Sequence, residues 1–344
     1  MPISINGSGT LTGLSVGGLE NGIITPAELS TGAPSWDAQY NLTNVASING
    51  SPLAGFRNAI INGGMQVAQR SAPTITGTPQ YGQADRFVAY ISGGTGISGT
   101  INQGADAQFK SGYRLWLASL SYTSGTWAIQ QRIESFNSIG LNGSTVTVSF
   151  KLYHDFGSSR TVGVSLAKAN AVDNFSSVTA IASTYTSPAL TSGVYSNVSC
   201  SFVIGASDAT NGILLQINDS SATTVSAKNI IIGDVQLEIG PVATPFERRP
   251  IGTELALCQR YYEIGTYFSE YYYSSGWSGK YDTVSFRTTK RAAPTIGGTF
   301  TGSGWTGAWG SDSATVDKFR FGNTATVNIG AHSHSANWTA SAEL

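Results

Sequence analysis

The clearest pattern along the chain is an alternation of apolar and polar residues between residues 127 and 240. In the segment TVTVSFKLY (145–153), polar residues alternate with four apolar ones, Val146, Val148, Phe150 and Leu152. A period of two residues is typical of a strand with one buried face. The same pattern recurs at 127–133 (with Gln131 at an apolar position), 161–166, 197–205, 212–219 and 234–240. Short strands joined by Gly, Ser, Asn and Asp predict an antiparallel β-sandwich.

One short segment, ELALCQRYYEIG (254–265), departs from this period of two. Its residues Leu255, Cys258 and Tyr262 are spaced i, i+3 and i+7, which predicts about three turns of an amphipathic helix. Pro250 precedes the helix, Thr253 is its expected N-cap, and Gly265 is expected to end it. We expect this helix to connect two β units and to pack its apolar face between them.

Strand patterns return after the helix, at 282–300, 318–323 and 324–330. They predict a second, smaller β domain, so the chain is expected to be all-β apart from the linking helix. The sandwich is assigned to residues 53–250, because three prolines in GPVATPFERRP end its last strand. Residues 251–344 then hold the linking helix and a C-terminal β tip.

Residues 1–52 differ from the rest of the chain. Their apolar residues are scattered between glycines, at Ile5, Leu11, Leu14, Val16, Leu19, Ile23 and Ile24. A segment this short cannot bury them in a core of its own. Thr25–Pro26–Ala27–Glu28 is a capping box with proline at the first helical position, which predicts a helix of one or two turns. We interpret residues 1–52 as an extended arm that packs against other chains.

Composition supports this reading and narrows the classes of function. Glycine makes up 41 of 344 residues and charged residues only 11%, as suits strands and tight turns. The net charge is −1, so the sequence predicts no binding to nucleic acid. The start MPISINGSGT lacks the features of a signal peptide, and no apolar run reaches the roughly eighteen residues of a transmembrane helix. We therefore expect synthesis in a cytosol and no membrane insertion.

The two cysteines leave two interpretations open. Cys200 shares a strand face with Val198, Phe202 and Ile204 and is expected to be a small buried side chain. A disulfide between Cys200 and Cys258 is the alternative, although a reducing compartment disfavours it.

Four motifs taken together resemble bacteriophage and prophage tail-fibre or receptor-binding proteins. They are IINGGMQVAQRS (60–71), ADRF (84–87), DVQLEIGPVATPFERRPIGTELALCQRYYE (234–263) and VSFRTTKRAAPTI (284–296). The resemblance covers about residues 56–297, and TLTGLSVGGLENGIITPAELS resembles the particle-proximal end of such fibres. It implies a jelly roll similar to carbohydrate-binding modules, a linking helix and assembly as a homotrimer. The arm would then pack against its own copies.

The chain departs from the resemblance at one point. Many carbohydrate-binding modules begin with N-G-x-F-E, where the acidic residue helps to bind a structural calcium ion. Here the matching stretch is Asn62–Gly63–Gly64–Met65–Gln66, with a neutral glutamine in place of the carboxylate. Calcium prefers several charged oxygen ligands. Asp234 alone is a weak remnant of such a site, and we expect no cofactor.

The sequence offers little support for catalysis. Glycoside cleavage needs two carboxylates placed across a bond, and Asp312 and Asp317 read as ordinary turn residues. The three histidines are His154, His332 and His334, and no serine lies in a G-x-S-x-G motif. We therefore predict a protein that is not an enzyme.

Aromatic residues are unusually dense in the last 80 residues. The candidates for glycan binding are Tyr267, Tyr271, Tyr272, Tyr273, Trp277, Trp305, Trp309 and Trp338. Sugar rings stack on exposed aromatic rings, while Asn, Asp and Ser groups bind their hydroxyls. The alternative is that these rings fill the core of the tip. On a strand, Tyr271 and Tyr273 face one way and Tyr272 the other, so at least one of them should be exposed.

His332 and His334 form an H-x-H pair that resembles metal sites in other phage fibres. On a strand both would project to one face, and threefold symmetry would bring six imidazoles to an axis, which suits a transition metal. The alternative is two solvated loop histidines.

Small basic clusters stand at Arg248, Arg249, Lys290 and Arg291. They would either contact anionic lipopolysaccharide or pair with Glu247 and Glu254 at the boundary between the domains.

The hypothesis from the sequence is a phage tail fibre or receptor-binding protein, made in the host cytoplasm and carried on the virion tail. Residues 1–52 would attach it to other tail proteins, and the tip would bind a host surface polysaccharide or lipopolysaccharide. Three weak sites would act together through avidity. The alternatives are a purely structural tail, collar or baseplate component, and a capsule-degrading enzyme.

Overall fold

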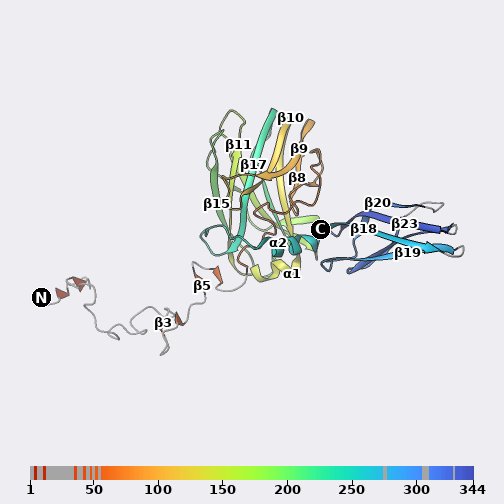
Figure 1. Ribbon diagram of the computed structural model, residues 1–344. Helices are drawn as coiled ribbons and strands as arrows, with labels where there is room; N and C mark the ends of the chain where they lie inside the picture. Colours follow the sequence, from red (N-terminus) through yellow and green to blue (C-terminus); the bar gives the residue numbers. More distant parts are fainter. Residues whose placement is uncertain are drawn as a thin grey trace. The chain divides into compact units, whose positions relative to one another are not determined.

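The computed structural model describes residues 56–273, 277–303, 310–327 and 330–344, and six very short strands within the first 55 residues. The chain divides into two compact units, Met1–Gly55 and Phe56–Leu344. The fold is all-β, as predicted, with two α-helices and a short 3-10 helix in the described part of the second unit (Figure 1). None of the described helices is long and apolar enough to cross a membrane.

The first unit contains three antiparallel pairs of two-residue strands. These pairs are β1 (Ser4–Ile5) with β2 (Leu11–Thr12), β3 (Ser35–Trp36) with β4 (Leu42–Thr43), and β5 (Ser47–Ile48) with β6 (Ser51–Pro52). The capping box predicted at residues 25–28 lies outside the described residues.

The second unit begins with a large, curled antiparallel sheet that forms a two-layered sandwich. The first layer follows the order β9 (Thr95–Ala105), β10 (Tyr113–Ile133), β17 (Thr223–Ile239), β11 (Thr145–His154) and β15 (Ser196–Val203). The second follows β7 (Gln80–Tyr81), β8 (Val88–Ser92), β10 again, β16 (Ile213–Asp219) and β12 (Val162–Ala171), which also pairs with β13 (Asn174–Ala180) and β14 (Tyr185–Thr186).

Strand β10 belongs to both layers because it bends in its middle. Its pairing with β9 and β17 shifts in register between Leu117 and Gly125. Ser119 and Ser124 have φ angles of 51° and 52° in the left-handed region, as expected at bulges. From Thr126 onward the strand pairs with β8 and β16 of the other layer.

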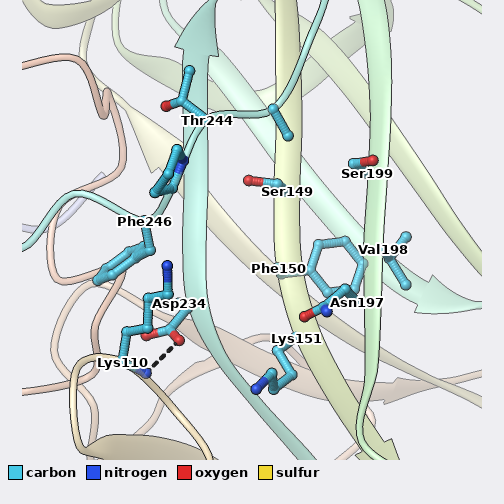
Figure 2. A pocket seen from close by; sticks show the side chains of 12 residues that line it. Lys110, Ser149, Phe150, Lys151, Asn197, Val198, Ser199, Asp234, Thr244 and Phe246 are labelled. Atoms are coloured by element: carbon cyan, nitrogen blue, oxygen red, sulfur yellow. Dashed lines mark hydrogen bonds between the residues drawn. The ribbon is translucent and has the colours of Figure 1, made fainter.

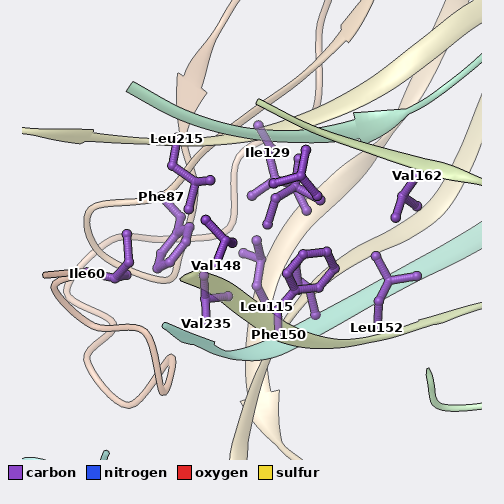
Figure 3. Close-up of a cluster of buried hydrophobic side chains, with 14 of the residues drawn as sticks. Ile60, Phe87, Leu115, Ile129, Val148, Phe150, Leu152, Val162, Leu215 and Val235 are labelled. Atoms are coloured by element: carbon purple, nitrogen blue, oxygen red, sulfur yellow. The ribbon is translucent and has the colours of Figure 1, made fainter. Parts of the chain in front are cut away.

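The core of the sandwich confirms the predicted alternation. Val146, Val148, Phe150 and Leu152 are at most 3% exposed. Figure 3 shows Ile129, Val162 and Leu215 of the second layer facing Val148, Phe150 and Leu152 of the first. The odd polar residue on this face, Gln131, is 1% exposed, and its amide exchanges two hydrogen bonds of 2.8 Å with the backbone of Ile61. A buried amide is tolerated when it is paired in this way.

Three short helical segments accompany the sandwich, namely α1 (Ser135–Ser138), η1 (Ile139–Leu141) and α2 (Ile251–Gln259). Figure 1 shows α1 and α2 at the same end of the sandwich. The predicted linking helix therefore exists, but its limits were wrong. Pro250 rather than Thr253 is the N-cap, and strand β18 begins at Tyr262, three residues before the predicted stop. Cys258 and Tyr261 are fully buried, whereas Tyr262 is half-buried, because strand pairing resets the spacing of the faces.

The tip, residues 262–344, contains two three-stranded antiparallel sheets. One follows β18 (Tyr262–Tyr273), β23 (Gly330–Ser341) and β20 (Thr295–Ser303), and the other β19 (Trp277–Ser285), β22 (Lys318–Val327) and β21 (Gly310–Ala314). Their shared core consists of Val284, Phe319, Phe321, Ala336, Trp338 and Ala340. The tip therefore has a hydrophobic core of its own, separate from that of the sandwich.

The cysteines are both buried and free. Cys200 lies in the sandwich core on the predicted strand face, and Cys258 packs with Ile61, Val67 and Tyr261. The alternative of a disulfide between them is therefore wrong. Burial raises the pKa of Cys200 to about 12 and that of Cys258 well above its usual value, so neither thiol is reactive near neutral pH.

Candidate functional site

The motifs that carry the sequence resemblance meet where the sandwich contacts the tip, a region called the seam here. Arg70 and Asp85 of the sandwich lie 3.0 Å apart, and Arg70 also pairs at 2.7 Å with Glu343 of the tip. Arg86 pairs with the second oxygen of Glu343. The guanidinium of Arg70 lies 3.6 Å from the centre of the Tyr262 ring. Burial raises the pKa of Asp85, and the charge of Arg70 opposes that shift.

The end of helix α2 continues the seam. Arg260 pairs with Glu134 at 2.7 Å, and the hydroxyl of Tyr261 donates to the same carboxylate at 2.7 Å. The guanidinium of Arg86 lies 3.6 Å from the centre of the Tyr261 ring. The resemblance motifs thus supply the contacts that join sandwich to tip, and their residues are engaged in structure.

The asparagine and glycines of the first motif shape a tight turn against β17. Asn62 has a φ of 59°, and its side chain bonds the backbone of Val67 and Asp85. A Cβ atom on Gly63 would lie 2.0 Å from the carbonyl oxygen of Val235, so the position requires glycine. The carboxylate of Asp234 accepts hydrogen bonds from the backbone N–H groups of Lys110 and Ser111. Among the described residues, no group of three or more His, Cys, Asp or Glu side chains is arranged to hold a metal ion.

The basic clusters are mostly paired at the seam, although not always with the predicted partners. Arg249 is buried and lies 3.2 Å from Glu254, as predicted. Lys290 pairs instead with Glu263, and Arg291 donates to the carbonyl oxygen of Ala342 at 2.6 Å. Arg248 is exposed.

Two of the candidate aromatic rings belong to the core of the tip. Trp338 is 4% exposed and packs on Phe319, with ring centres 5.2 Å apart. Tyr267 makes an edge contact with Phe321 at 5.3 Å. For these two rings the structure favours the alternative that they fill the core.

Asp282 joins β18, β19 and β23 inside the tip. Its carboxylate accepts a hydrogen bond of 2.8 Å from the hydroxyl of Tyr271 and lies 2.9 Å from Nδ1 of His334. The ammonium of Lys280 lies 3.2 Å from the same carboxylate and 3.9 Å from the centre of the Tyr271 ring. His332 points to the same side of β23 as His334, with Nδ1 3.2 Å from the carbonyl oxygen of Ser303. Both histidines are buried and lie on a strand, so the alternative interpretation, two solvated histidines in a loop, is wrong. A metal ion shared by three chains stays a prediction.

The outer face of the β18–β23–β20 sheet exposes apolar side chains. Ile264, Phe268 and Tyr272 lie at every fourth position of β18, on one face of the strand, and are 39%, 64% and 74% exposed. Tyr272 therefore confirms that at least one ring of the tyrosine run is exposed. Beside them lie rows of hydroxyl groups on the other two strands, with hydrogen-bonded pairs Thr301–Ser335 (2.7 Å) and Ser303–Ser333 (3.0 Å).

A cleft of about 440 Å³ lies at the end of this face. Its described lining residues are Glu270, Tyr271, Tyr272, Ser303, Ala331, His332 and Ser333. The cleft brings together two of the predicted glycan-binding tyrosines and one of the predicted metal-binding histidines. Trp305 and Trp309 lie outside the described residues, as do the side chains of Tyr273 and Trp277.

Sequence reasoning missed Phe268. The alternation of faces along a strand could have identified it, because Phe268 and Tyr272 are four residues apart and therefore share one face. We refer to this surface, with Phe268, Tyr272 and the adjoining hydroxyl rows, as the tip face.

A second pocket of about 320 Å³ lies on the outside of the sandwich (Figure 2). Its floor is formed by polar side chains of β11 and β15, and the loop after β17 forms one wall. It is lined by Lys110, Ser149, Phe150, Lys151, Asn197, Val198, Ser199, Asp234, Ala243, Thr244, Pro245 and Phe246. Of these residues, only Asp234 was considered from the sequence, as the remnant of a calcium site.

Comparison with known proteins shows distant structural similarity and no sequence family. No protein-family model matches the chain, and no curated protein matches it. Carbohydrate-binding modules from the β-sandwich superfamily align over 44% of this chain and 57% of theirs, with 12% identity and a TM-score of 0.35. The CBM22-2 xylan-binding domain of Xyn10C from Paenibacillus barcinonensis aligns over 54% of this chain and 98% of its own, with 15% identity and a TM-score of 0.29.

A phage protein is also among the similar structures. The enzymatically active domain of tailspike protein 4 of bacteriophage CBA120 aligns over 45% of this chain and 19% of its own, with 12% identity and a TM-score of 0.31. These alignments cover about half of this chain. They cover less than two thirds of the tailspike domain and of the carbohydrate-binding modules from the β-sandwich superfamily.

Proposed function

We propose that the protein is a tail-fibre or receptor-binding protein of a phage that binds a host surface glycan through the tip face. The observation that carries this proposal is the exposure of Phe268 and Tyr272 beside rows of serine and threonine hydroxyls. Together with Ile264 they form an exposed apolar patch on one face of the sheet, and such patches often mark interaction sites.

The chemistry of the tip face suits a sugar chain. Phe268 and Tyr272 are four residues apart on β18, which corresponds to about 13 Å along a strand. Two sugar rings of one chain can therefore stack on them at once, while Ser333, Ser335 and Thr301 bond the hydroxyls. The adjoining cleft adds Glu270 as an acceptor.

We propose binding without catalysis. Glycosidases place two carboxyl groups on opposite sides of the scissile bond. Glu270 is the one carboxylate among the described residues that line the cleft. Asp282 is engaged by Tyr271 and His334 in the interior of the tip.

In the proposed assembly, residues 1–52 attach three chains to other tail proteins of the virion, and the tips act together. Stacking on two aromatic rings gives only weak binding per site, and avidity from several tips raises it by orders of magnitude. The protein would be made in the host cytoplasm and act at the host cell surface.

One observation favours a second function, a purely structural component of the tail. Strand β18 (Tyr262–Tyr273) lies at the edge of its sheet, where side chains bond the carbonyl oxygens of Tyr262 and Ile264 and the exposed ring of Phe268 lies further along the strand. Such an edge also suits a contact with another subunit.

Binding of the purified protein to a panel of bacterial lipopolysaccharides and capsular polysaccharides, followed by interferometry, separates these functions. Phe268→Ala and Tyr272→Ala should each weaken glycan binding by about tenfold, since stacking contacts contribute on the order of 1 kcal/mol or more. Val203→Ala, which removes a 70% exposed side chain from the sandwich, is the matched control and should bind normally.

The structural alternative predicts a different result. If no polysaccharide binds, and Phe268→Ala changes the mass of the assembly in light scattering, the tip face is a subunit contact. Release of reducing sugars by the wild-type protein would contradict the absence of catalysis.

A further inference from the structure

The pocket on the outside of the sandwich has the construction of a binding site. Ser149 and Lys151 of β11 lie opposite Ser199 and Asn197 of β15 in the strand register, so four polar side chains form one floor. Figure 2 shows Thr244 and Phe246 on one side of this floor and Asn197 and Ser199 on the other. The floor therefore lies in a groove.

The wall of the groove is held in place from behind. The hydroxyl of Thr244 donates to Glu238 at 2.6 Å, and its N–H donates to the same carboxylate at 2.8 Å. The ring of Phe246 packs against Gly64, where a Cβ atom would lie 3.4 Å from the ring and 2.9 Å from Ser111. The loop thus presents Phe246 with little freedom, which lowers the entropy cost of binding.

Two ammonium groups flank the groove. The ammonium of Lys151 donates to the carbonyl oxygen of Gln108 at 2.6 Å, which fixes its position. Figure 2 shows the side chain of Lys110 rising beside Asp234 toward Phe246. The groove therefore carries two positive charges on opposite sides of its lower end.

The carboxylate in the pocket, Asp234, offsets one of these two charges, so the groove keeps a net positive charge. Asp234 accepts from the backbone N–H of Lys110 at 2.7 Å and from that of Ser111 at 3.1 Å. Both oxygens are thereby engaged, and Asp234 holds the loop that carries Lys110. The φ of Asp234, 52°, is in the left-handed region, which directs the side chain to this loop. Asp234 is a positioning residue.

The floor continues along the strands to a pair of aromatic rings. Tyr153 follows Lys151 on the same face of β11, and its ring centre lies 4.9 Å from that of Tyr195. The hydroxyl of Tyr195 donates to Asp106 at 2.8 Å, which orients the ring. A ligand longer than one sugar unit could thus contact Phe246 at one end and this pair at the other.

We propose that this groove binds an acidic glycan, a polysaccharide segment whose sugars bear carboxylate groups. Lys110 and Lys151 pair with carboxylates, the amide of Asn197 and the hydroxyls of Ser149 and Ser199 bond sugar hydroxyls, and Phe246 stacks on a ring. The site lies on a different sheet from the tip face and does not depend on the function proposed for that face.

The test uses the full chain and a fluorescent octamer of galacturonic acid, together with the same octamer after its carboxyl groups have been reduced. The reduced octamer carries an uncharged hydroxymethyl group in place of each carboxylate. Fluorescence anisotropy should show the acidic octamer binding at least about tenfold more tightly, since charge-assisted hydrogen bonds contribute more than neutral ones. Its binding should weaken as the salt concentration rises.

Lys110→Ala and Lys151→Ala should each reduce the affinity for the acidic octamer by about tenfold and leave that for the reduced octamer unchanged. Lys110 is exposed and Lys151 is half-buried, so both variants should stay folded, with only a small change in melting temperature for Lys151→Ala. Lys228→Ala is the matched control, because it removes a charge from β17 outside the pocket and should bind the acidic octamer normally.

Three results would overturn the proposal. These are equal binding of the two octamers, no binding of either, and an equal loss in the Lys228→Ala control, which would mean a general charge effect. Tyr272→Ala should leave octamer binding unchanged. A failure at the tip face is therefore distinguishable from a failure here.

Discussion

At the scale of single residues, one ion pair in the tip is fully shielded from water. The side chains of Lys290 and Glu263 are each 0% exposed, and their charged atoms lie 2.5 Å apart. The ammonium also donates to the carbonyl oxygens of Gln259 at 2.7 Å and Thr288 at 2.9 Å, so all three of its protons have acceptors. Burial lowers the pKa of Lys290, and Glu263 opposes this shift. Each charge is tolerated because the other is present.

Replacing Lys290 with methionine should therefore lower the free energy of unfolding by about 3–5 kcal/mol, because the buried charge of Glu263 would keep only the exposed Arg287, 3.5 Å away, as a cationic partner. Changing Glu263 to glutamine in the same chain should recover part of that loss. Lys318→Met, at an exposed lysine of β22, should stay within about 0.5 kcal/mol of the wild type. Denaturant titration followed by circular dichroism measures all three. A Lys290→Met protein as stable as the control would show that water reaches the pair.

Sequence reasoning identified buried positions better than it identified partners. The alternation around Val148 or Cys200 depends only on neighbouring residues, so the buried face could be predicted. Lys290 was assigned to Glu247 or Glu254, but its partner is Glu263. Which carboxylate a lysine meets depends on how distant segments approach, and no local pattern contains that information.

At the scale of elements, strands were predictable where one conformation persists. Strand β11 keeps a strict period of two and was recognised over its whole length. Only 127–133 of β10 was recognised, because the left-handed residues Ser119 and Ser124 interrupt the alternation upstream. The end of α2 was misplaced because the pairing of Tyr262 with Ser341 of β23 begins the next strand early. The tip face could not be predicted for the same reason. It depends on the pairing of β23 with β18 and β20, which places the hydroxyl rows of β20 and β23 beside Phe268.

The interior of the tip makes its packing sensitive to acid. Burial lowers the pKa of His334 from its usual 6.5, although Asp282 opposes the shift, and the charges of Lys280 and His332 lower it further. Burial would raise the pKa of Asp282, but hydrogen bonds from His334, Tyr271 and Lys280 hold it below its usual 3.8. As the pH falls through about 6.5, the unfolded chain gains the His334 proton first. The contribution of His334 to stability is therefore present above pH 6.5 and is lost below it. That of Asp282 is lost only near and below its usual value.

We expect the free energy of unfolding to fall between pH 7.5 and 5.5, with a slope from His334 of at most about 1.4 kcal/mol per pH unit. His334→Gln should make this dependence shallower, whatever its effect on absolute stability. His154 of the sandwich is also buried with a lowered pKa and contributes a similar dependence, so His154→Gln is measured beside it. Denaturant titrations at five pH values give the slopes. A His334→Gln slope equal to that of the wild type would place the histidine in contact with water.

At the scale of the whole molecule, the seam joins sandwich and tip into one compact unit, Phe56–Leu344. Arg70 and Arg86 of the sandwich both pair with Glu343, and Arg260 pairs with Glu134. The pairs with Glu343 are largely buried, and losing one partner of such a pair strongly destabilises a fold, so we expect the two β parts to unfold together. The order of motifs in the sequence indicated that they belong together, but it could not indicate that they meet at one seam, because that requires the fold.

The arm is expected to behave differently, because Phe56–Leu344 is a compact unit by itself. Deleting residues 2–50 should leave the circular dichroism spectrum and the melting temperature of the β unit unchanged. We predict that the apolar residues between the arm's glycines are buried against other copies of the chain, so the full protein should be a trimer, with about three times the chain mass of 36.0 kDa in light scattering. The deleted chain should lose incorporation into virions. A full-length monomer would reject the trimer, and normal incorporation of the deleted chain would assign attachment to another part of the protein. If folding is also followed by tryptophan fluorescence, the emission of Trp36, which lies in the deleted segment, must be subtracted before the spectra of the two chains are compared.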